Sequence, residues 1–334
     1  MSNQTAQPLS HQVPIAVVIP AFNVENKIES VIQKIPSYIN HIIVVNDASR
    51  DTTRKIVESI NKPNLYLINH QKNQGVGGAM ISGYTKATEL GAKIIVKIDG
   101  DGQMDARKIP DLINPIIEKQ ADYTKGNRFL HSTQLLKMPF LRRIGNWNLT
   151  FLVKSASGYW PIFDPANGFT AIHVNAWNAL EKKQIAKDFF FETSMLIALR
   201  KISAVVKDIQ IPAIYNDEDS SLRISNILLT FPARLLSGFL KRIYFQYFLY
   251  NFSFASLAFI LGPVFILFGF VWGGWYWHQS SLSGIPATTG TVLIAVLPII
   301  LGTQLLLQGI AIDIDSTPSN CIHPDLIDNN NPLE

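Results

Sequence analysis

The stretch "AKIIVKIDGDGQM", residues 92–104, decides the fold. It begins as a run of β-type residues and ends in Asp99, Asp101 and Gln103, which alternate with two glycines. Carboxylates that crowd the end of a buried strand repel one another unless a cation lies among them, and such hard oxygen ligands suit Mg²⁺ or Mn²⁺. The alternative is a plain acidic turn, because Asp-Gly is a common turn pair.

The residues before this stretch alternate between strand and helix patterns. The predicted strands are 13–20, 41–46, 64–69 and 92–98, and the predicted helices are 24–35, 49–60 and 75–91. Near-continuous apolar strands separated by helices indicate an α/β fold with a parallel sheet covered on both faces. Ligands of such sheets bind beyond the carboxyl ends of the strands, so the acids after the second and fourth strands mark the candidate site.

The C-terminal third has the composition of a membrane segment. No Asp, Glu, Lys or Arg occurs from 243 to 312, and all 29 Lys and Arg precede this region. Segments 252–272 and 289–312 can each span a bilayer, which takes about 20 apolar residues. Core helices of a soluble protein are the alternative, but an uncharged apolar run of this length favours a two-helix transmembrane hairpin.

Charge indicates how this hairpin is oriented. Five of the 25 acids follow position 312, so residues 1–242 hold 29 cations and 20 acids, a net charge of +9. Cations flank the first span and the loop between the spans has none, which predicts that the N-terminal part stays in the cytosol. Such a basic domain is attracted to an anionic leaflet, or equally to a phosphorylated substrate.

Five parts of the chain are expected. They are a tail at 1–12, an α/β domain at 13–222, interfacial amphipathic helices at 223–251, the hairpin at 252–312 and an acidic tail at 313–334. Apolar residues interleaved with arginine and lysine before the first span are typical of helices in the membrane interface, although packing against the α/β domain explains them too. The single cysteine, Cys321, excludes an intrachain disulfide.

Six motifs in order resemble one known family. They are "VVIPAFNVENKI", "VVNDASRDTT", "NQGVGGA", "KIDGDGQM", "GNRF" and "FDPANGFTAI". Together they are similar to the family-2 inverting glycosyltransferases, in the polyprenyl-phosphate branch that includes dolichol-phosphate mannose synthase and bacterial members with two C-terminal transmembrane helices. The resemblance implies a Rossmann-like nucleotide-sugar transferase domain of the A-type glycosyltransferase fold, on the cytoplasmic side of a bacterial-type inner (plasma) membrane.

The resemblance also implies roles on the donor side. The nucleotide would lie against Pro20, Ala21, Phe22 and Glu25, with Asp47 near the base and ribose. The metal ion, Mg²⁺ or Mn²⁺, would be held by Asp99, Asp101 and Gln103, with Gly100 beside the diphosphate.

On the acceptor side, Arg128 and Arg142 would grip a lipid phosphate, with Arg143 as the alternative for the second role. Asp101, Arg128 and Asp164 would be the catalytic residues. Asp164 would orient the acceptor or the metal shell, although Asp before Pro also starts turns.

The expected reaction is transfer of a sugar from a UDP- or GDP-linked donor to a polyprenyl phosphate, with inversion. The expected partners are therefore a nucleotide-sugar, a polyprenyl phosphate and the lipid bilayer, but no nucleic acid, and a homo-oligomer stays open. One alternative is a membrane transferase that uses a polysaccharide or glycolipid acceptor, although the Gln-x-x-Arg-Trp motif of polysaccharide synthases is absent. A non-enzymatic scaffold is the other, although it would be expected to lose some of Asp47, Asp99, Asp101 and Arg128, and all four are present.

Overall fold

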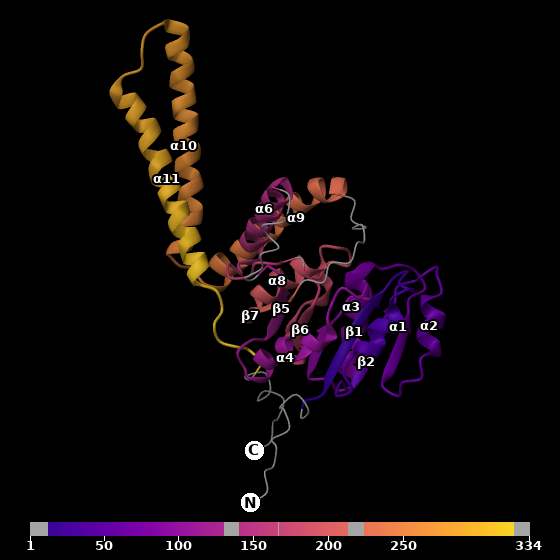
Figure 1. Ribbon diagram of the computed structural model, residues 1–334. Helices are drawn as coiled ribbons and strands as arrows, with labels where there is room; N and C mark the ends of the chain where they lie inside the picture. Colours follow the sequence, from indigo (N-terminus) through magenta and orange to yellow (C-terminus); the bar gives the residue numbers. More distant parts are fainter. Residues whose placement is uncertain (1–12, 130–139, 166, 213–223, 324–334) are drawn as a thin grey trace, which may run out of the picture. The chain divides into compact units, whose positions relative to one another are not determined.

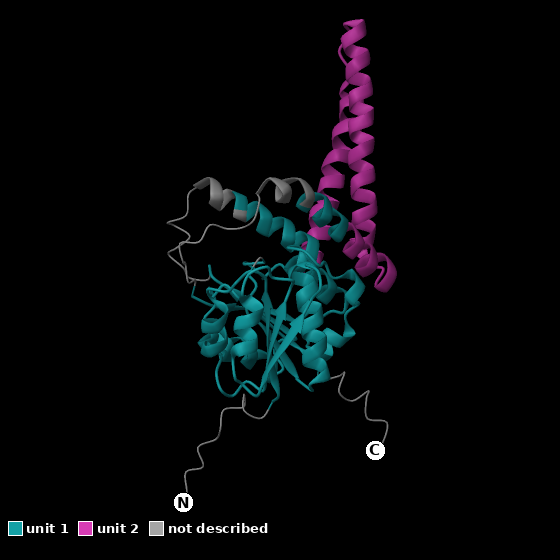
Figure 2. Cartoon of the chain, turned by 90° about the vertical axis from the view of Figure 1, so that its right-hand side faces the viewer, with its two compact units in different colours: residues 1–239, 318–334 teal, residues 240–317 magenta. Residues whose placement is uncertain are grey.

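The computed structural model describes residues 13–129, 140–165, 167–212 and 224–323. The chain forms two compact units, one of residues 1–239 and 318–334 and the other of residues 240–317, coloured teal and magenta in Figure 2. The boundary between residues 239 and 240 falls inside helix α9 (Ile224–Tyr244). The earlier part of this helix belongs to the first unit, since Leu235 is buried in that unit's core.

The first unit is built on a seven-stranded sheet (Figure 1). Its strand order is β3-β2-β1-β4-β6-β5-β7, from β1 (Ile15–Ala21), β2 (His41–Asn46), β3 (Leu65–Asn69), β4 (Ile94–Lys97), β5 (Tyr123–Asn127), β6 (Thr170–His173) and β7 (Val206–Gln210). The first four strands are parallel, as predicted. The sheet as a whole is mixed, because β6 runs antiparallel to both β4 and β5.

Helices cover both faces of the sheet, as the apolar strands predict. They are α1 (Ile28–Lys34), α2 (Thr53–Ser59), α3 (Gly75–Glu89), α4 (Ile109–Ile117), α6 (Phe140–Ser157), α7 (Val174–Ala179) and α8 (Phe191–Lys201). Side chains alternate along β1, so that Ala16 and Val18 join a core with α3, α7 and α8. Val17 and Ile19 join the opposite core with α1 and α4. The carboxyl ends of β1, β2 and β4 therefore meet at one edge between two helical layers.

Helix α9 packs on the first unit, which was the alternative to an interfacial position. Phe231 and Phe239 lie against its core around Leu235. The guanidinium of Arg234 pairs with Asp188 at 2.7 Å, so this predicted flanking cation has a partner in its own unit. Leu236, two residues further on, is 59% exposed and leaves apolar surface on this helix.

The chain after the hairpin returns to the first unit. Asp122, directly before β5, is fully buried, and its carboxylate accepts hydrogen bonds from the backbone N–H groups of Val205, Ile322 and His323 at 2.8–3.0 Å. The ring Nδ1 of His323 lies 2.7 Å from the same carboxylate. Residues 321–323 of the expected acidic tail, here called the strap, thus lie against Asp122 beside β5 and are hydrogen-bonded to it through Ile322 and His323.

The second unit contains helices α10 (Phe254–Ser283) and α11 (Thr289–Asp315). By length and composition both can cross a membrane. Only 28% of the most apolar part of α10 and 11% of that of α11 are buried, whereas core helices of a soluble protein are mostly buried. Helix α10 continues past the predicted end at 272, because no residue stops it before Gly284, which caps it in the left-handed conformation at φ 68°. The expected loop at 273–288 is therefore reduced to 284–288.

Glycines form the seam between these two helices. Gly262 and Gly269 of α10 and Gly302 and Gly309 of α11 are buried, each pair seven residues apart. A Cβ on Gly302 would lie 2.6 Å from the carbonyl oxygen of Gly262, and one on Gly269 would lie 2.5 Å from that of Ala295. Small residues that let backbones approach closely are how helices associate in lipid.

We expect Gly302→Leu to destabilise the hairpin by about 1 to 3 kcal/mol, the usual cost of overpacking. The matched control is Gly274→Leu on α10, because a Cβ there meets nothing within 4 Å. Thermal unfolding of both variants in detergent measures the difference. Equal melting temperatures for the two variants would mean that the helices do not pack through this seam.

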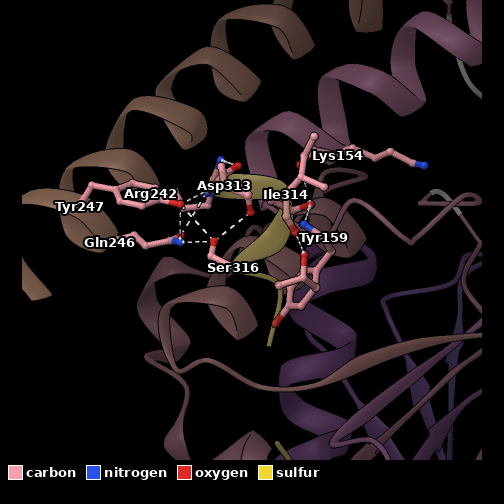
Figure 3. Close-up of polar contacts among 10 residues, drawn as sticks. Lys154, Tyr159, Arg242, Gln246, Tyr247, Asp313, Ile314 and Ser316 are labelled. Carbon is pink, nitrogen blue, oxygen red and sulfur yellow. Dashed lines mark hydrogen bonds and ion pairs between the residues drawn. The ribbon is translucent and has the colours of Figure 1, made fainter. Parts of the chain in front are cut away.

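A buried ion pair closes the hairpin at its base (Figure 3). Arg242 and Asp313 are 1% and 3% exposed, and their side chains meet at 2.5 and 3.0 Å. The hydroxyl of Tyr247, in the π-helical turn Phe245–Tyr250, donates to the same carboxylate at 2.9 Å. Gln246 and Ser316 complete the group. A predicted interfacial cation and a predicted tail acid are thus paired with each other.

Candidate active site

The loop after β1 and the loop after β2 are hydrogen-bonded to each other at the carboxyl ends of these strands. The carboxylate of Glu25 accepts hydrogen bonds from the backbone N–H of Thr52 at 2.8 Å and from its hydroxyl at 2.5 Å. Pro20 and Ala21 form the end of β1, and Phe22 is 47% exposed beyond it. The residues predicted to hold the nucleotide therefore lie at one edge of the sheet, and the ring of Phe22 offers an apolar face to a planar base.

Asp47 has a more structural environment than the resemblance implies. It is 3% exposed, and its carboxylate accepts hydrogen bonds from the backbone N–H groups of Gln74 and Gly75, at 2.9 and 2.8 Å. Nδ1 of His70 lies 2.7 Å from it. Asp47 thereby fixes the start of α3.

The opening stretch forms a tight turn at the end of β4. The carboxylate of Asp101 accepts a hydrogen bond from the backbone N–H of Gln103 at 2.9 Å, and Gly102 between them has φ 76°. A Cβ on Gly100 would lie 3.2 Å from the carbonyl oxygen of Pro20, so the turn packs closely on β1. The acidic turn and the ligand site are therefore compatible, because the same turn presents the acids at the sheet edge.

The donor set of this turn fits a hard divalent cation. Asp99, Asp101 and Gln103 are all partly exposed, and they supply two carboxylates and an amide oxygen. Mg²⁺ commonly takes one or two carboxylates and completes its shell with water and substrate phosphates.

A second group of metal-type side chains lies elsewhere, at Asp122, Cys321 and His323, within 4.8 Å of one another. It is better explained as the strap, because N–H donors already surround the carboxylate of Asp122.

Arg128 and Asp164 form a bidentate ion pair. Nε and Nη2 of Arg128 donate to the two oxygens of Asp164 at 2.8 and 3.1 Å, and the backbone N–H of Arg128 adds a third bond at 3.2 Å. The Asp164 side chain is 3% exposed, whereas that of Arg128 is 37% exposed. The buried carboxylate of Asp164 thus fixes the orientation of the guanidinium of Arg128, which stays partly exposed. The side chain of Arg142, in α6, lies outside the described part of the chain, as does that of Arg143.

Two buried lysines of this site were not predicted. Lys97 ends β4 and is 1% exposed, and its ammonium pairs with Asp99 at 2.7 Å and with Glu192 at 3.0 Å. Lys125 in β5 is fully buried and donates to the carbonyl oxygen of Asn167. Burial lowers the pKa of Lys125 to about 8, against the opposing effect of nearby carboxylates. The available signal was a lysine inside an otherwise apolar strand, as in "AKIIVKI".

Charged and polar side chains therefore link the end of β4 to Arg128. Asn167 donates to Asp164 at 3.4 Å, and a Cβ on the adjacent Gly168 would clash with both Lys97 and Asp99. The segment that carries Asp164, Asn167 and Gly168 thus lies between the acids of β4 and Arg128. These charged side chains lie at the carboxyl edge of an α/β sheet, which is where ligands of such sheets bind.

Comparison with known proteins identifies the family. The model of glycosyl transferase family 2 matches residues 16–180. UDP-N-acetylglucosamine–dolichyl-phosphate N-acetylglucosaminyltransferase of Methanococcus voltae is 32% identical over 65% of this chain and 92% of its own. Undecaprenyl-phosphate mannosyltransferase of Micrococcus luteus is 21% identical over 59% and 82%. The chain belongs to glycosyltransferase family 2, and these relatives support its polyprenyl-phosphate branch.

A solved structure confirms the predicted fold class. Glucosyl-3-phosphoglycerate synthase from Mycobacterium tuberculosis, crystallised with Mn²⁺, uridine diphosphate and phosphoglyceric acid, superposes with a TM-score of 0.50 over 70% of this chain and 80% of its own. At 17% identity this likeness shows the fold alone. The mixed sheet with its antiparallel β6 is therefore an A-type glycosyltransferase fold.

Proposed function

We propose that this protein transfers a sugar from a UDP- or GDP-linked donor to a polyprenyl phosphate at the cytosolic membrane face, with inversion at the anomeric carbon. The observation that carries the proposal is the similarity to the Methanococcus voltae dolichyl-phosphate transferase across 92% of that protein. Two apolar helices after the catalytic unit agree with a lipid acceptor.

On the donor side, the side chains at the ends of β1 and β4 have separate roles. Phe22 and the loop held by the hydrogen bonds between Glu25 and Thr52 would bind the nucleotide base. Asp47 would act on the nucleotide indirectly, because it fixes the start of α3. Asp99, Asp101 and Gln103 would hold Mg²⁺ or Mn²⁺, which when bound stabilises the charge that develops on the departing nucleoside diphosphate.

On the acceptor side, Arg128 would bind the lipid phosphate through its planar fork, which matches phosphate geometry. A phosphate monoester is already an anionic nucleophile, so its attack hardly needs a general base. Asp164 would then be a positioning residue, because its bonds are to Arg128 and not to a reacting atom. Arg142 stays a second proposed contact.

A panel assay tests this function. Membranes that contain the protein are incubated with labelled UDP- and GDP-sugars and a polyprenyl phosphate, and the product is extracted into organic solvent. We expect one donor to give a lipid-linked product that mild acid hydrolyses to a monosaccharide. Label that appears only in water-soluble polymer would support a polysaccharide acceptor instead.

We propose that both ends of the hairpin face the cytosol. A membrane-impermeant maleimide added to intact cells should then leave Cys321 unlabelled, and should label an Ala287→Cys, Cys321→Ser variant between α10 and α11. Because Cys321 is partly buried, permeabilised and denatured cells provide the positive control for its reactivity. Labelling of Cys321 in intact cells would reverse the proposed orientation.

A further inference from the structure

Lys97 occupies an unusual place for a cation. Its side chain is 1% exposed at the end of β4, two residues before the first proposed metal ligand. Burying an ammonium in a protein interior is unfavourable unless it is paired and hydrogen-bonded. Here it has two carboxylate partners, Asp99 at 2.7 Å and Glu192 at 3.0 Å, and the second comes from α8. The pair is therefore built into the core and is not a surface contact.

The backbone at Gly168 packs closely against the ion pair of Lys97 and Asp99. A Cβ on Gly168 would clash with Nζ of Lys97 and with the second carboxylate oxygen of Asp99, so glycine there leaves space for both groups. The backbone N–H of Asp99 is directed to the sulfur of Met104 at 3.3 Å, which fixes the main chain below the carboxylate. The ion pair with the buried Lys97 thus sets the orientation of the Asp99 carboxylate.

The ion pair also changes the charge that a metal ion meets. Asp99, Asp101 and Glu192 would together carry three negative charges, and the ammonium, 2.7 Å from Asp99 and 3.0 Å from Glu192, offsets one of them. The two carboxylates beside the ammonium favour its charged form. A divalent cation at the turn therefore meets an aspartate that already has a positive charge 2.7 Å away.

We propose that Lys97 is a positioning residue that holds Asp99 ready for the metal ion while it weakens metal binding in the absence of the donor diphosphate. The inference rests on the proposed function, because it assumes a divalent ion at Asp99 and Asp101. The diphosphate supplies the negative charge that Lys97 offsets, so metal and nucleotide bind tightly only together. The free enzyme then does not retain a metal without its donor.

Manganese titration of the purified full-length protein in detergent tests the proposal, since the electron paramagnetic resonance signal of free Mn²⁺ decreases as the ion binds. The variants are Lys97→Met and Lys97→Gln, which both remove the charge, and Lys97→Arg, which keeps it. Lys86→Met, on the exposed side of α3, is the control for the loss of one positive charge far from the site. Each protein is titrated alone and with UDP or GDP.

We expect Lys97→Met and Lys97→Gln to bind Mn²⁺ about ten- to a hundred-fold more tightly than the native protein when no nucleotide is present, with a smaller gain on adding nucleotide. Tenfold corresponds to about 1.4 kcal/mol. Lys97→Arg and Lys86→Met should stay near the native affinity. The Gln variant also removes the charge but keeps a polar side chain, so it tests the proposal if the Met variant does not fold.

An unchanged or lower Mn²⁺ affinity in the neutral variants would overturn the proposal, as would a native protein that binds Mn²⁺ equally well with and without nucleotide. Because the readout does not require sugar transfer, a failed donor panel and a failed metal titration are separate results. Transfer without any bound metal would likewise contradict this role for Lys97 and leave the lipid acceptor intact.

Discussion

Arg128→Ala should lose sugar transfer by about ten- to a hundred-fold while it binds the nucleoside diphosphate almost as well as the native protein. A lost charge-assisted hydrogen bond is worth about 1.5 to 3 kcal/mol, and each 1.4 kcal/mol is tenfold. The loss is larger if the contact strengthens in the transition state. Calorimetry of UDP or GDP binding, beside the lipid-transfer assay, separates the two substrates.

The partner of Arg128 has to be considered in this experiment. Asp164 is almost fully buried, so Arg128→Ala leaves it without this counter-ion and should also lower the melting temperature. The control is Arg128→Ala combined with Asp164→Asn, which removes the buried charge and should recover stability without recovering transfer. Arg128→Lys should rescue only in part, since it keeps the charge but loses the fork. Weak nucleotide binding with normal use of the lipid would instead assign Arg128 to the donor.

Chelation of divalent ions should abolish turnover, and Mg²⁺ or Mn²⁺ should restore it. The reason is that the departing diphosphate is negatively charged, so Asp99 and Asp101 would repel it unless a divalent cation lies between them. Asp101→Ala should show the same loss, and added metal should not reverse it. The measurement is initial rate against free metal concentration after treatment with EDTA.

Asp101→Ala should also weaken nucleotide binding, in contrast to Arg128→Ala. Asp105→Ala is a matched control on the same loop, since that carboxylate pairs with the exposed Arg107. Full activity in metal-free buffer would remove the metal assignment of all three residues.

The first half of the fold could be predicted because its signals are local. Alternating apolar strands and amphipathic helices up to position 98 fix four parallel strands, and the turn of Asp99 and Asp101 follows from their position at a strand end. The reversed β6 could not be predicted, because its four residues carry little pattern and its pairing with β4 joins residues far apart in sequence.

The same limit applies to the site. The sequence shows that Lys97 lies in an apolar strand, but its partner Glu192 is 95 residues away. Asp164 was a candidate with two interpretations, and only the fold shows that it faces Arg128. Residue types and strand ends are readable from the chain, whereas depth and long-range pairing depend on tertiary packing.

The ion pair between Arg242 and Asp313 has a consequence for the order in which the protein is made. The arginine leaves the ribosome 71 residues before its acid, and both apolar helices lie between them. A chain that stops after α10 has the arginine and no Asp313 to receive it. The ion pair therefore forms only after both helices have been made, and a truncated chain differs from a finished one by a guanidinium without this counter-ion.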